Sequence, residues 1–206
     1  MQIKKADLEK KILELGTIEL LEKGYDKASI RKIARECNIS PGNFYSYFKS
    51  KEDLYINVTL AFNQDRIDVL YKEMRKGRTA EEKLRNYGLA YLEYAKKNIN
   101  KFRLFMYYEL NGLNDNNLSE KTKEKFMNET NTNRQEFKDV IEMGKKNGEF
   151  SKRINTNRLI INFTMSIRIA LNEIVLLNYQ KEDFFNDYLD FIMFGILENK
   201  YNMEEK

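Results

Sequence analysis

The sequence contains no histidine and very few of the residues that usually interrupt helices. Of its 206 residues, one is proline, nine are glycine and one is cysteine. This scarcity of proline and glycine favours an almost wholly helical chain. Without histidine, Ser-His and Cys-His nucleophile pairs and most protein metal sites are excluded. The single Cys37 excludes an internal disulfide framework and fits a reducing compartment.

Long apolar runs and cofactor-binding loops are also missing from the sequence. The first residues are charged throughout and hold no apolar stretch of secretory length. No run approaches the roughly 18 to 20 apolar residues that cross a bilayer, so we expect a cytoplasmic protein without a membrane partner. Phosphate loops of the GxGxxG or GxxxxGK type are absent. We therefore expect no cofactor, no bound metal and no enzymatic activity.

What the sequence does contain is enough apolar material for a core and a locally strong positive charge. Hydrophobic residues make up 42% of the chain and charged residues 33%, which suits a soluble protein with a real core. The net charge is only +4, yet residues 27–51 include six basic residues and a single acid, Glu36. A phosphate backbone attracts such a local excess. A solvated helix face would carry the same charges, so both interpretations stay open.

Turn and capping residues predict two helices at the start of the chain. The apolar stripe of residues 5–23 predicts a first helix, and Gly24 suits a left-handed helix end. Ser29 can cap a second helix over residues 30–37, because its hydroxyl accepts a bond from an otherwise unpaired backbone N–H.

A third, short helix follows after a sharp corner. Ser40 can cap it, and Pro41 stands at the first helical position, where a missing N–H costs nothing. It is expected to extend over residues 42–48, with Phe44 and Phe48 facing inward and its polar residues facing outward. A helix, a turn and a short helix with a polar outer face are typical of the helix-turn-helix, whose second helix enters the major groove.

The remaining sequence predicts further helices, one of which opens with a Thr79–Glu82 capping box. The loop 111–119 is rich in asparagine and separates two of them. The predicted fold class is therefore all-α, with an N-terminal three-helix helix-turn-helix domain at residues 1–49 and a larger helical domain at residues 50–206. The expected helices of the larger domain cover residues 51–76, 79–97, 101–110, 120–146, 157–178 and 181–199.

The run GYDKASIRKIARECNISPGNFYSYFKSKEDLY, residues 24–55, resembles the DNA-binding region of tetracycline-repressor (TetR) family transcription regulators. A Gly-Tyr turn, a capped Ile-Ala helix, an Ile-Ser corner and a Phe-Tyr-x-Tyr-Phe helix occur in the family's register. Outside this run the resemblance is limited to helicity and length. Cys37 and Asn38 stand where the family usually has Ala and Gly. Pro41 replaces a frequent basic residue and Ser46 a common His, which affects base preference rather than fold.

The resemblance implies which residues contact DNA. Asn43 and Tyr45 lie on the outward face of the third helix and are expected at base edges, since Asn pairs with adenine and a Tyr ring packs on a thymine methyl. Arg31 is expected to reach a guanine or a phosphate. Half-buried packing is the alternative for the two outward tyrosines. The remaining predicted DNA contacts, mostly to phosphates, are Ser29, Ser40, Pro41, Gly42, Ser46, Tyr47, Lys49 and Lys51.

The resemblance also implies a small, largely apolar effector bound among the middle helices of the larger domain. Apolar walls with a few polar groups are usual in ligand sites. Ordinary core packing would explain the same aromatic residues. The predicted effector-binding residues are Tyr87, Tyr91, Tyr94, Phe102, Phe105, Met106, Phe126, Phe163 and Arg168.

The last two predicted helices are more apolar all round than surface helices should be. Together with the resemblance, this predicts a homodimer in which these helices pair with their symmetry mates in a four-helix bundle. A two-fold dimer implies a roughly palindromic double-stranded DNA operator. We expect a repressor that an effector releases from this operator. A membrane-surface helix is disfavoured because the last helix carries more acids than bases.

Three other functions remain open at this point. The same DNA-binding region would serve a protein without an effector, which acts through protein partners or chromosome organisation. An all-α metal enzyme has little support, because histidine is absent and the stretch 114–117 is better explained as a loop. A helical adaptor that binds only protein conflicts with the specific run at residues 24–55.

Overall fold

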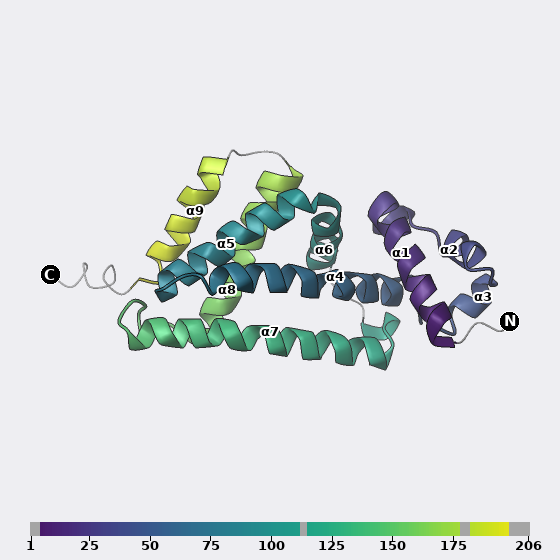
Figure 1. The fold of residues 1–206 in the computed structure, drawn as a ribbon, viewed down its shortest axis with the longest axis horizontal. Coiled ribbons are helices and arrows are strands. Elements are labelled where there is room, and N and C mark those ends of the chain that lie inside the picture. The colour runs from purple at the N-terminus through teal and green to yellow at the C-terminus, as the bar shows by residue number, and fades with distance from the viewer. Residues whose placement is uncertain (1–4, 112–114, 178–181, 198–206) are drawn as a thin grey trace. The chain divides into compact units, whose positions relative to one another are not determined.

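A computed structural model of the chain describes residues 5–111, 115–177 and 182–197, and these residues are almost entirely helical (Figure 1). One isolated antiparallel bridge joins Phe150 to Leu197. The predicted all-α fold is confirmed over this part of the chain. In chain order the elements are α1 (Lys5–Lys27), α2 (Ile30–Glu36), α3 (Pro41–Phe44), α4 (Lys51–Met74), α5 (Ala80–Lys97), α6 (Ile99–Asn111), the 3-10 turn η1 (Asp115–Asn117), α7 (Glu120–Lys146), α8 (Thr156–Leu171), the π-helical turn η2 (Asn172–Leu176) and α9 (Glu182–Phe194).

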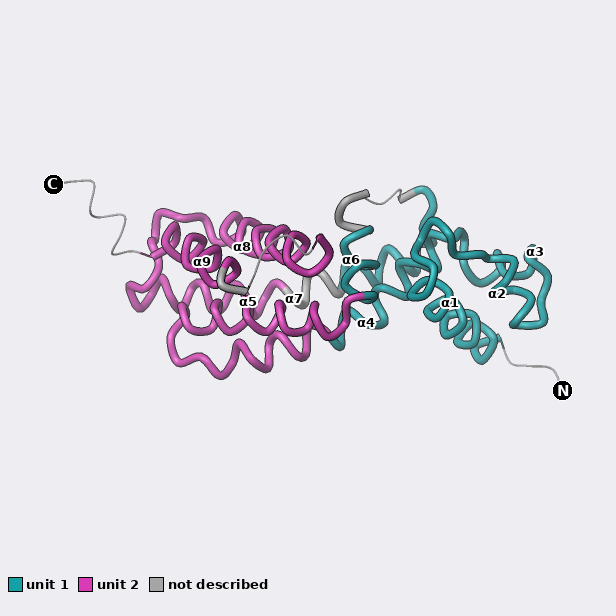
Figure 2. Tube along the Cα trace, turned by 90° about the horizontal axis from the view of Figure 1, so that it is seen from above, with its two compact units in different colours: residues 1–65, 100–128 teal, residues 66–99, 129–206 magenta. Residues whose placement is uncertain are grey.

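The chain divides into two compact units (Figure 2). Unit 1 comprises residues 1–65 and 100–128, and unit 2 comprises residues 66–99 and 129–206. Besides α1 to α3, unit 1 therefore includes the first part of α4, nearly all of α6 and the start of α7. The expected domain boundary between residues 49 and 50 does not coincide with the division into these two units. The domain assignment therefore stays a prediction.

The core of unit 1 forms where α1, α2, α3 and α4 turn their apolar residues inward. Ile12, Ile33 and Phe44 are almost fully buried there. Gly16 of α1 faces Leu54 of α4 so closely that an added Cβ would lie 2.9 Å from a Leu54 methyl group. The missing side chain thus lets α1 approach α4 closely.

Unit 2 is held by the packing of α5, α8 and α9. Thr79 opens α5 with the predicted capping box: its hydroxyl accepts a bond from the Glu82 backbone N–H at 3.1 Å, and the Glu82 carboxylate accepts from the Thr79 N–H at 3.5 Å. Gly88 lies against Leu189 and Ile167, where a Cβ would be 3.2 Å from a Leu189 methyl group. The absence of a side chain at Gly88 therefore lets α5 approach α8 and α9 closely.

Several helices end earlier than the sequence predicts, among them α9, which ends at Phe194 rather than Asn199. The third helix ends at Phe44 rather than Phe48, because the backbone N–H groups of Ser46 and Tyr47 bond three residues back, to Asn43 and Phe44. Such bonds wind the chain more tightly than an α-helix does. The helix α8 ends at Leu171, and its continuation η2 is π-helical.

One segment corrects the expectation that nothing in the chain is apolar enough to span a membrane. The 21-residue segment Thr156–Leu176 passes that test by length and composition. The expectation counted uninterrupted apolar residues, and polar positions such as Asn162 and Arg168 interrupt the run without changing its overall character. The core helices of soluble proteins pass the same test, and 39% of the apolar window is buried, so this is weak evidence for a membrane.

Candidate nucleic-acid interface

The two short helices α2 and α3 begin at the serines that the sequence predicts. The Ser29 hydroxyl accepts a bond from the Lys32 N–H at 3.3 Å, and the Ser40 hydroxyl accepts one from the Asn43 N–H at 3.1 Å. Asn38 makes the corner between them with a φ of 58°, a left-handed conformation that Asn tolerates well. The Ser40 cap and the backbone conformation of Asn38 therefore determine the direction in which α3 begins.

The outer face of α3 is polar and open to solvent. Phe44 and Phe48 are buried and stack with ring centroids 5.8 Å apart. Tyr45 is 53% exposed and its ring stands edge-on to Phe44 at 5.3 Å. The Ser46 hydroxyl lies 2.7 Å from the Asn43 carbonyl oxygen and 3.1 Å from its side-chain oxygen. Asn43 and Tyr45 are therefore oriented by neighbours in the same turn.

A partly buried ion pair that sequence inspection missed holds α1 against the start of α2. The Glu19 carboxylate accepts a bond from the Lys32 ammonium at 2.5 Å and from the Ser29 N–H at 3.2 Å. Burial alone would raise the pKa of Glu19, but these bonds and the charge of Lys32 lower it overall. The pairing spans 13 positions of sequence, and nothing in the local pattern around either residue indicates it.

Two residues that are predicted to contact phosphates, Lys49 and Lys51, donate hydrogen bonds to carbonyl oxygens of unit 1. The Lys49 ammonium donates to the Leu118 carbonyl oxygen at 3.2 Å. The Lys51 ammonium donates to the Asp26 carbonyl oxygen at 3.1 Å and lies 4.9 Å from the centre of the Tyr25 ring. Burial lowers the pKa of Lys51, an effect that Asp26 opposes. An ammonium group has three N–H donors, so these bonds leave donors for a phosphate, and both phosphate contacts stay predictions.

The other predicted DNA contacts differ in how accessible they are. Ser29 is half-buried, as a capping residue should be, and Tyr47 is half-buried with the Lys5 ammonium 6.0 Å from its ring centre. Half-buried packing, the alternative left open for the outward tyrosines, therefore applies to Tyr47 but not to Tyr45. The exposed members of the set are Arg31, Ser40, Pro41, Gly42, Asn43, Tyr45, Ser46 and Lys49.

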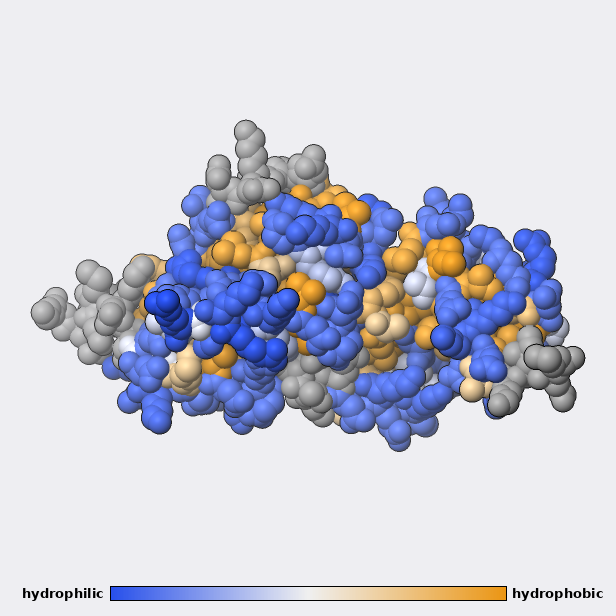
Figure 3. Space-filling model, viewed as in Figure 1, coloured by the Kyte–Doolittle hydropathy of each residue, from blue (hydrophilic) through white to orange (hydrophobic). Residues whose placement is uncertain are grey.

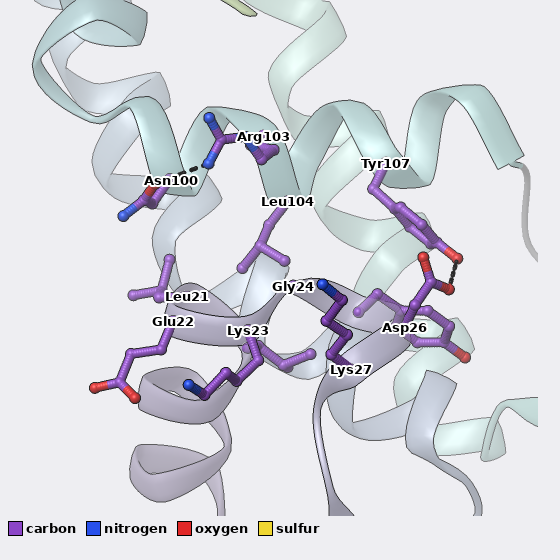
Figure 4. A pocket seen from close by; sticks show the side chains of 12 residues that line it. Leu21, Glu22, Lys23, Gly24, Asp26, Lys27, Asn100, Arg103, Leu104 and Tyr107 are labelled. Carbon is purple, nitrogen blue, oxygen red and sulfur yellow. Dashed lines mark hydrogen bonds between the residues drawn. The ribbon is translucent and has the colours of Figure 1, made fainter.

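A pocket lies between the end of α1 and α6 in unit 1 (Figure 4). It encloses about 290 Å³. At one end the Tyr107 hydroxyl donates to the Asp26 carboxylate at 2.9 Å. The rings of Tyr25 and Tyr107 are 5.0 Å apart, and those of Tyr25 and Tyr55 are also 5.0 Å apart. These three tyrosines connect α1, α4 and α6.

The predicted effector-binding residues fall into two groups. Phe102, Phe105, Met106 and Phe126 belong to unit 1, where Phe126 packs against the core around Phe44. The others belong to unit 2 and are Tyr87, Tyr91, Tyr94, Phe163 and Arg168. The predicted residues thus fall in two different units, and both groups stay predictions as effector-binding residues.

Tyr87 is the centre of the aromatic cluster in unit 2. Its ring lies 4.7 Å from Phe137, 6.2 Å from Tyr91 and 6.4 Å from Phe163. Burial raises the pKa of Tyr87 to about 12, while the positive charges of Arg66 and Arg168 pull it down. Arg66 was not singled out in the sequence, because a lone arginine in the middle of a long helix looks like a surface residue.

Exposed apolar residues follow the outer faces of α8 and α9. Ile161, Met165 and Ile169 recur every four residues along α8 and are 43%, 49% and 57% exposed. On α9, Phe191 and Phe194 are 75% and 54% exposed. A groove of about 350 Å³ between the two helices is lined by residues that include Phe191 and Asn162. Elsewhere, the face seen in Figure 3 is mostly hydrophilic, with apolar areas between the charged ones.

Comparison with known proteins identifies the N-terminal region. The family model described as bacterial regulatory proteins, tetR family, matches residues 12–58. An uncharacterized HTH-type transcriptional regulator of Bacillus subtilis, YuxN, is 46% identical over 50 residues, which are 24% of this chain and 17% of that protein. The fatty acid metabolism regulator protein of the same organism is 30% identical over 73 residues, which are 35% of this chain and 38% of that protein. The alignments thus span much less than the full length of these relatives.

Solved structures share the fold over most of the chain. A TetR family transcription regulator from Marinobacter aquaeolei has a TM-score of 0.66 and 15% identity, covering 94% of this chain and 97% of that one. The regulator FadR from Bacillus subtilis, solved in complex with stearoyl-CoA, has a TM-score of 0.66 and 19% identity, covering 89% and 97%. At such identities the likeness concerns the fold alone.

Proposed function

Because the chain belongs, through residues 12–58, to the tetR family of bacterial regulatory proteins, we propose that it is a cytoplasmic, sequence-specific DNA-binding transcription regulator. It is a repressor that binds a palindromic double-stranded operator as a homodimer. A small, largely apolar effector releases it. The family consists of DNA-binding regulators rather than enzymes, which agrees with the absence of histidine.

The exposed face of α3 within the matched segment carries this proposal. A serine-capped helix begins at Pro41, its aromatic side anchors it to the core, and Asn43 and Tyr45 remain on the accessible side. Side chains of this kind read base edges in the major groove. Arg31 lies exposed on α2, the helix that crosses the DNA backbone in a helix-turn-helix.

Selection of tight binders from random DNA tests the proposal. The wild type should select a palindrome, and Tyr45→Ala should bind all sequences with little preference among them. The loss of one good base contact corresponds to about 1–3 kcal/mol of discrimination. Arg31→Ala, if Arg31 binds a phosphate, should weaken every sequence alike and lower the salt slope by about one.

A matched control is Lys72→Ala, which removes one exposed positive charge from α4 in unit 2. It should leave both the selected sequence and the salt slope unchanged. If the wild type selects no sequence and binds all DNA equally, the specific-operator proposal is wrong, and an architectural or adaptor role replaces it.

We place the effector in unit 2, around Tyr87 and Phe163, where aromatic rings supply apolar walls. The FadR regulator that shares the fold binds stearoyl-CoA, which supports an effector with a long apolar body. Release from DNA requires that the effector bind one conformation of the dimer better than the other. In unit 1 the bond between Tyr107 of α6 and Asp26 of α1 is a suitable connection for transmitting such a change.

Dimerisation through α8 and α9 is supported by their exposed apolar residues, which a soluble monomer rarely leaves open in one contiguous area. Phe191→Glu should shift the protein to monomer in sedimentation measurements and abolish cooperative operator binding. The control Asn186→Glu places the same charge on an exposed polar position of α9 and should leave the dimer intact. A dimer that survives Phe191→Glu would rule out this face.

A further inference from the structure

The cleft between the end of α1 and the first part of α6 lies in unit 1, and the proposed function does not use it as a binding site. Its volume is about 290 Å³. An engineered apolar cavity of about 150 Å³ holds one benzene molecule, so this cleft has room for a ring with a short chain. Gly24 lines the cleft, and among the described residues no atom beyond its chain neighbours lies within 4 Å of the position that a Cβ would take. No side chain therefore closes the cleft at this point.

The floor of the cleft is apolar. Leu20 of α1 and Leu104 of α6 line it and are 1% and 3% exposed, and Leu21 and Tyr25 line it as half-buried residues. In Figure 4, Leu104 points from α6 toward the end of α1. Apolar walls that come from two elements are usual in small-molecule sites. A ligand with an apolar body would therefore contact both helices.

The charged side chains of the cleft carry one more positive than negative charge. Three cations and two acids line it: Lys23, Lys27, Arg103, Glu22 and Asp26. One of the two acids already has a donor, because the Asp26 carboxylate accepts a bond from a tyrosine hydroxyl at 2.9 Å. A ligand with a single negative charge would balance this set, whereas a cation would add to its excess.

Arg103 is the cation best suited to bind the negative group of such a ligand. Its Nη1 atom donates to the side-chain oxygen of Asn100 at 3.2 Å, and both residues lie on the part of α6 that lines the cleft (Figure 4). In the part of the chain that the structure describes, this is the one side-chain hydrogen bond of Arg103, so further guanidinium donors remain for a ligand. A guanidinium presents paired N–H donors that match the two oxygens of a carboxylate.

We propose that this cleft is a second ligand site, which binds a small amphipathic monoanion: an organic acid whose carboxylate contacts Arg103 and whose aromatic or aliphatic body covers the apolar floor. The ammonium groups of Lys23 and Lys27 add positive charge to the same cleft. The proposal goes beyond the proposed function, in which the effector lies in unit 2, and it does not depend on DNA binding. A ligand that contacts α1 and α6 together stabilises the packing of these two helices.

Calorimetric titration of the full-length wild type with three matched probes tests the charge preference. Phenylacetate, phenethyl alcohol and phenethylamine share one ring and chain length and differ in the charge of the head group. Phenylacetate should bind about three- to tenfold more tightly than the alcohol at low salt, because charged contacts at an exposed rim contribute modestly. This preference should decrease in about 1 M salt, which screens exposed charges. Equal affinity for phenylacetate and the alcohol, tightest binding of the amine, or no binding of phenylacetate overturns the proposal.

Substitution of Arg103 assigns the preference to this cleft. Arg103→Met keeps an apolar stem and removes the charge, so it should lower the affinity for phenylacetate to about that for the alcohol and leave alcohol binding unchanged. Lys10→Met is the control, because Lys10 lies on α1 outside the cleft with its side chain 78% exposed. This variant should keep the preference of the wild type. An unchanged preference in Arg103→Met means that phenylacetate binds elsewhere and overturns the proposal.

A change in the apolar floor tests where the body of the ligand lies. Leu21→Trp places a large ring at the half-buried edge of the cleft and should abolish binding of phenylacetate and the alcohol alike. If this variant unfolds, Leu21→Ser replaces it and should weaken both probes by a similar factor. Unaltered binding of both probes to a folded Leu21 variant overturns the proposal.

The titrations contain no DNA, so their outcome is independent of the proposed function. A wild type that selects an operator but does not bind phenylacetate contradicts only this second site. A wild type that selects no operator yet binds phenylacetate through Arg103 contradicts the regulator and supports the site.

Discussion

Each unit contains three neighbouring tyrosines beside a cation, and the two clusters differ in what surrounds the cation. In unit 1, Tyr25, Tyr55 and Tyr107 lie together, with the Lys51 ammonium over the Tyr25 ring. In unit 2, Tyr71, Tyr87 and Tyr91 lie together, with the Arg66 guanidinium over the Tyr91 ring. Residue composition alone would assign both clusters the same role.

Their polar partners give them different roles. In unit 1, Tyr107 donates to the Asp26 carboxylate, Tyr55 to the Leu104 carbonyl oxygen and Lys51 to the Asp26 carbonyl oxygen. Such a compensated cluster stabilises the contact of α1 with α4 and α6. In unit 2, Arg66 donates to the Tyr91 hydroxyl, and its guanidinium lies over the Tyr91 ring. The first cluster therefore joins three helices through carboxylate and carbonyl acceptors, whereas the second contains residues of the proposed effector site.

The largest expected effect is on the stability of unit 1. Tyr55 is only 2% exposed, so Tyr55→Ala should cost about 3–5 kcal/mol of unfolding free energy, as other large buried aromatics do. Tyr87→Ala should cost less, because Tyr87 is half-buried. Urea unfolding of both variants measures the difference. A Tyr87→Ala variant as unstable as Tyr55→Ala would make the unit 2 cluster structural as well.

A second prediction concerns the charge compensation of unit 1. Glu19→Gln should cost about 2 kcal/mol at neutral pH, because it removes a charged hydrogen-bond acceptor from Lys32 and Ser29. The pKa of Glu19 is lowered in the folded state, so its contribution is present at neutral pH and is lost as the pH falls below roughly 4. Acid unfolding of the wild type should therefore approach that of Glu19→Gln at low pH. A constant difference between them at all pH values would contradict this role.

A third, smaller effect should appear in coupling rather than in stability. Tyr107→Phe removes the hydroxyl that bonds Asp26 and should cost about 1 kcal/mol. Operator affinity without effector should change little, whereas release by the effector should weaken, because α6 loses its bond to α1. A double-mutant cycle with Asp26→Asn isolates the pair. Additive effects of the two substitutions on release would mean that this bond transmits nothing.

How much of this could be predicted from the sequence depends on whether a feature is local. The caps at Ser29 and Ser40 and the outward position of Tyr45 follow from neighbouring residues, and the sequence predicts them. The early end of α3 was missed because the competition between α-helical and 3-10 bonds at Ser46 depends on small energy differences.

Features that join distant positions could not be predicted. The pairs Glu19 with Lys32 and Arg66 with Tyr91 are separated by 13 and 25 positions, and only the folded chain brings them together. Charge counting also did not indicate that the ammonium groups of Lys49 and Lys51 bond carbonyl oxygens of unit 1. Composition cannot distinguish a cation that faces DNA from one that closes a fold.

The smallest expected effects, in the ionisation of individual tyrosines, give the sharpest form of the comparison. The pKa of both Tyr107 and Tyr87 is raised to about 12, mainly by burial; Asp26 contributes to the rise at Tyr107, whereas Arg66 opposes the rise at Tyr87. Removing each partner should therefore have opposite consequences. In ¹³C NMR titrations of labelled tyrosine, Asp26→Asn should lower the pKa of Tyr107 and Arg66→Met should raise that of Tyr87, each corresponding to less than about 1.4 kcal/mol. Shifts of the same sign would contradict the opposite effects of Asp26 and Arg66 on these two tyrosines.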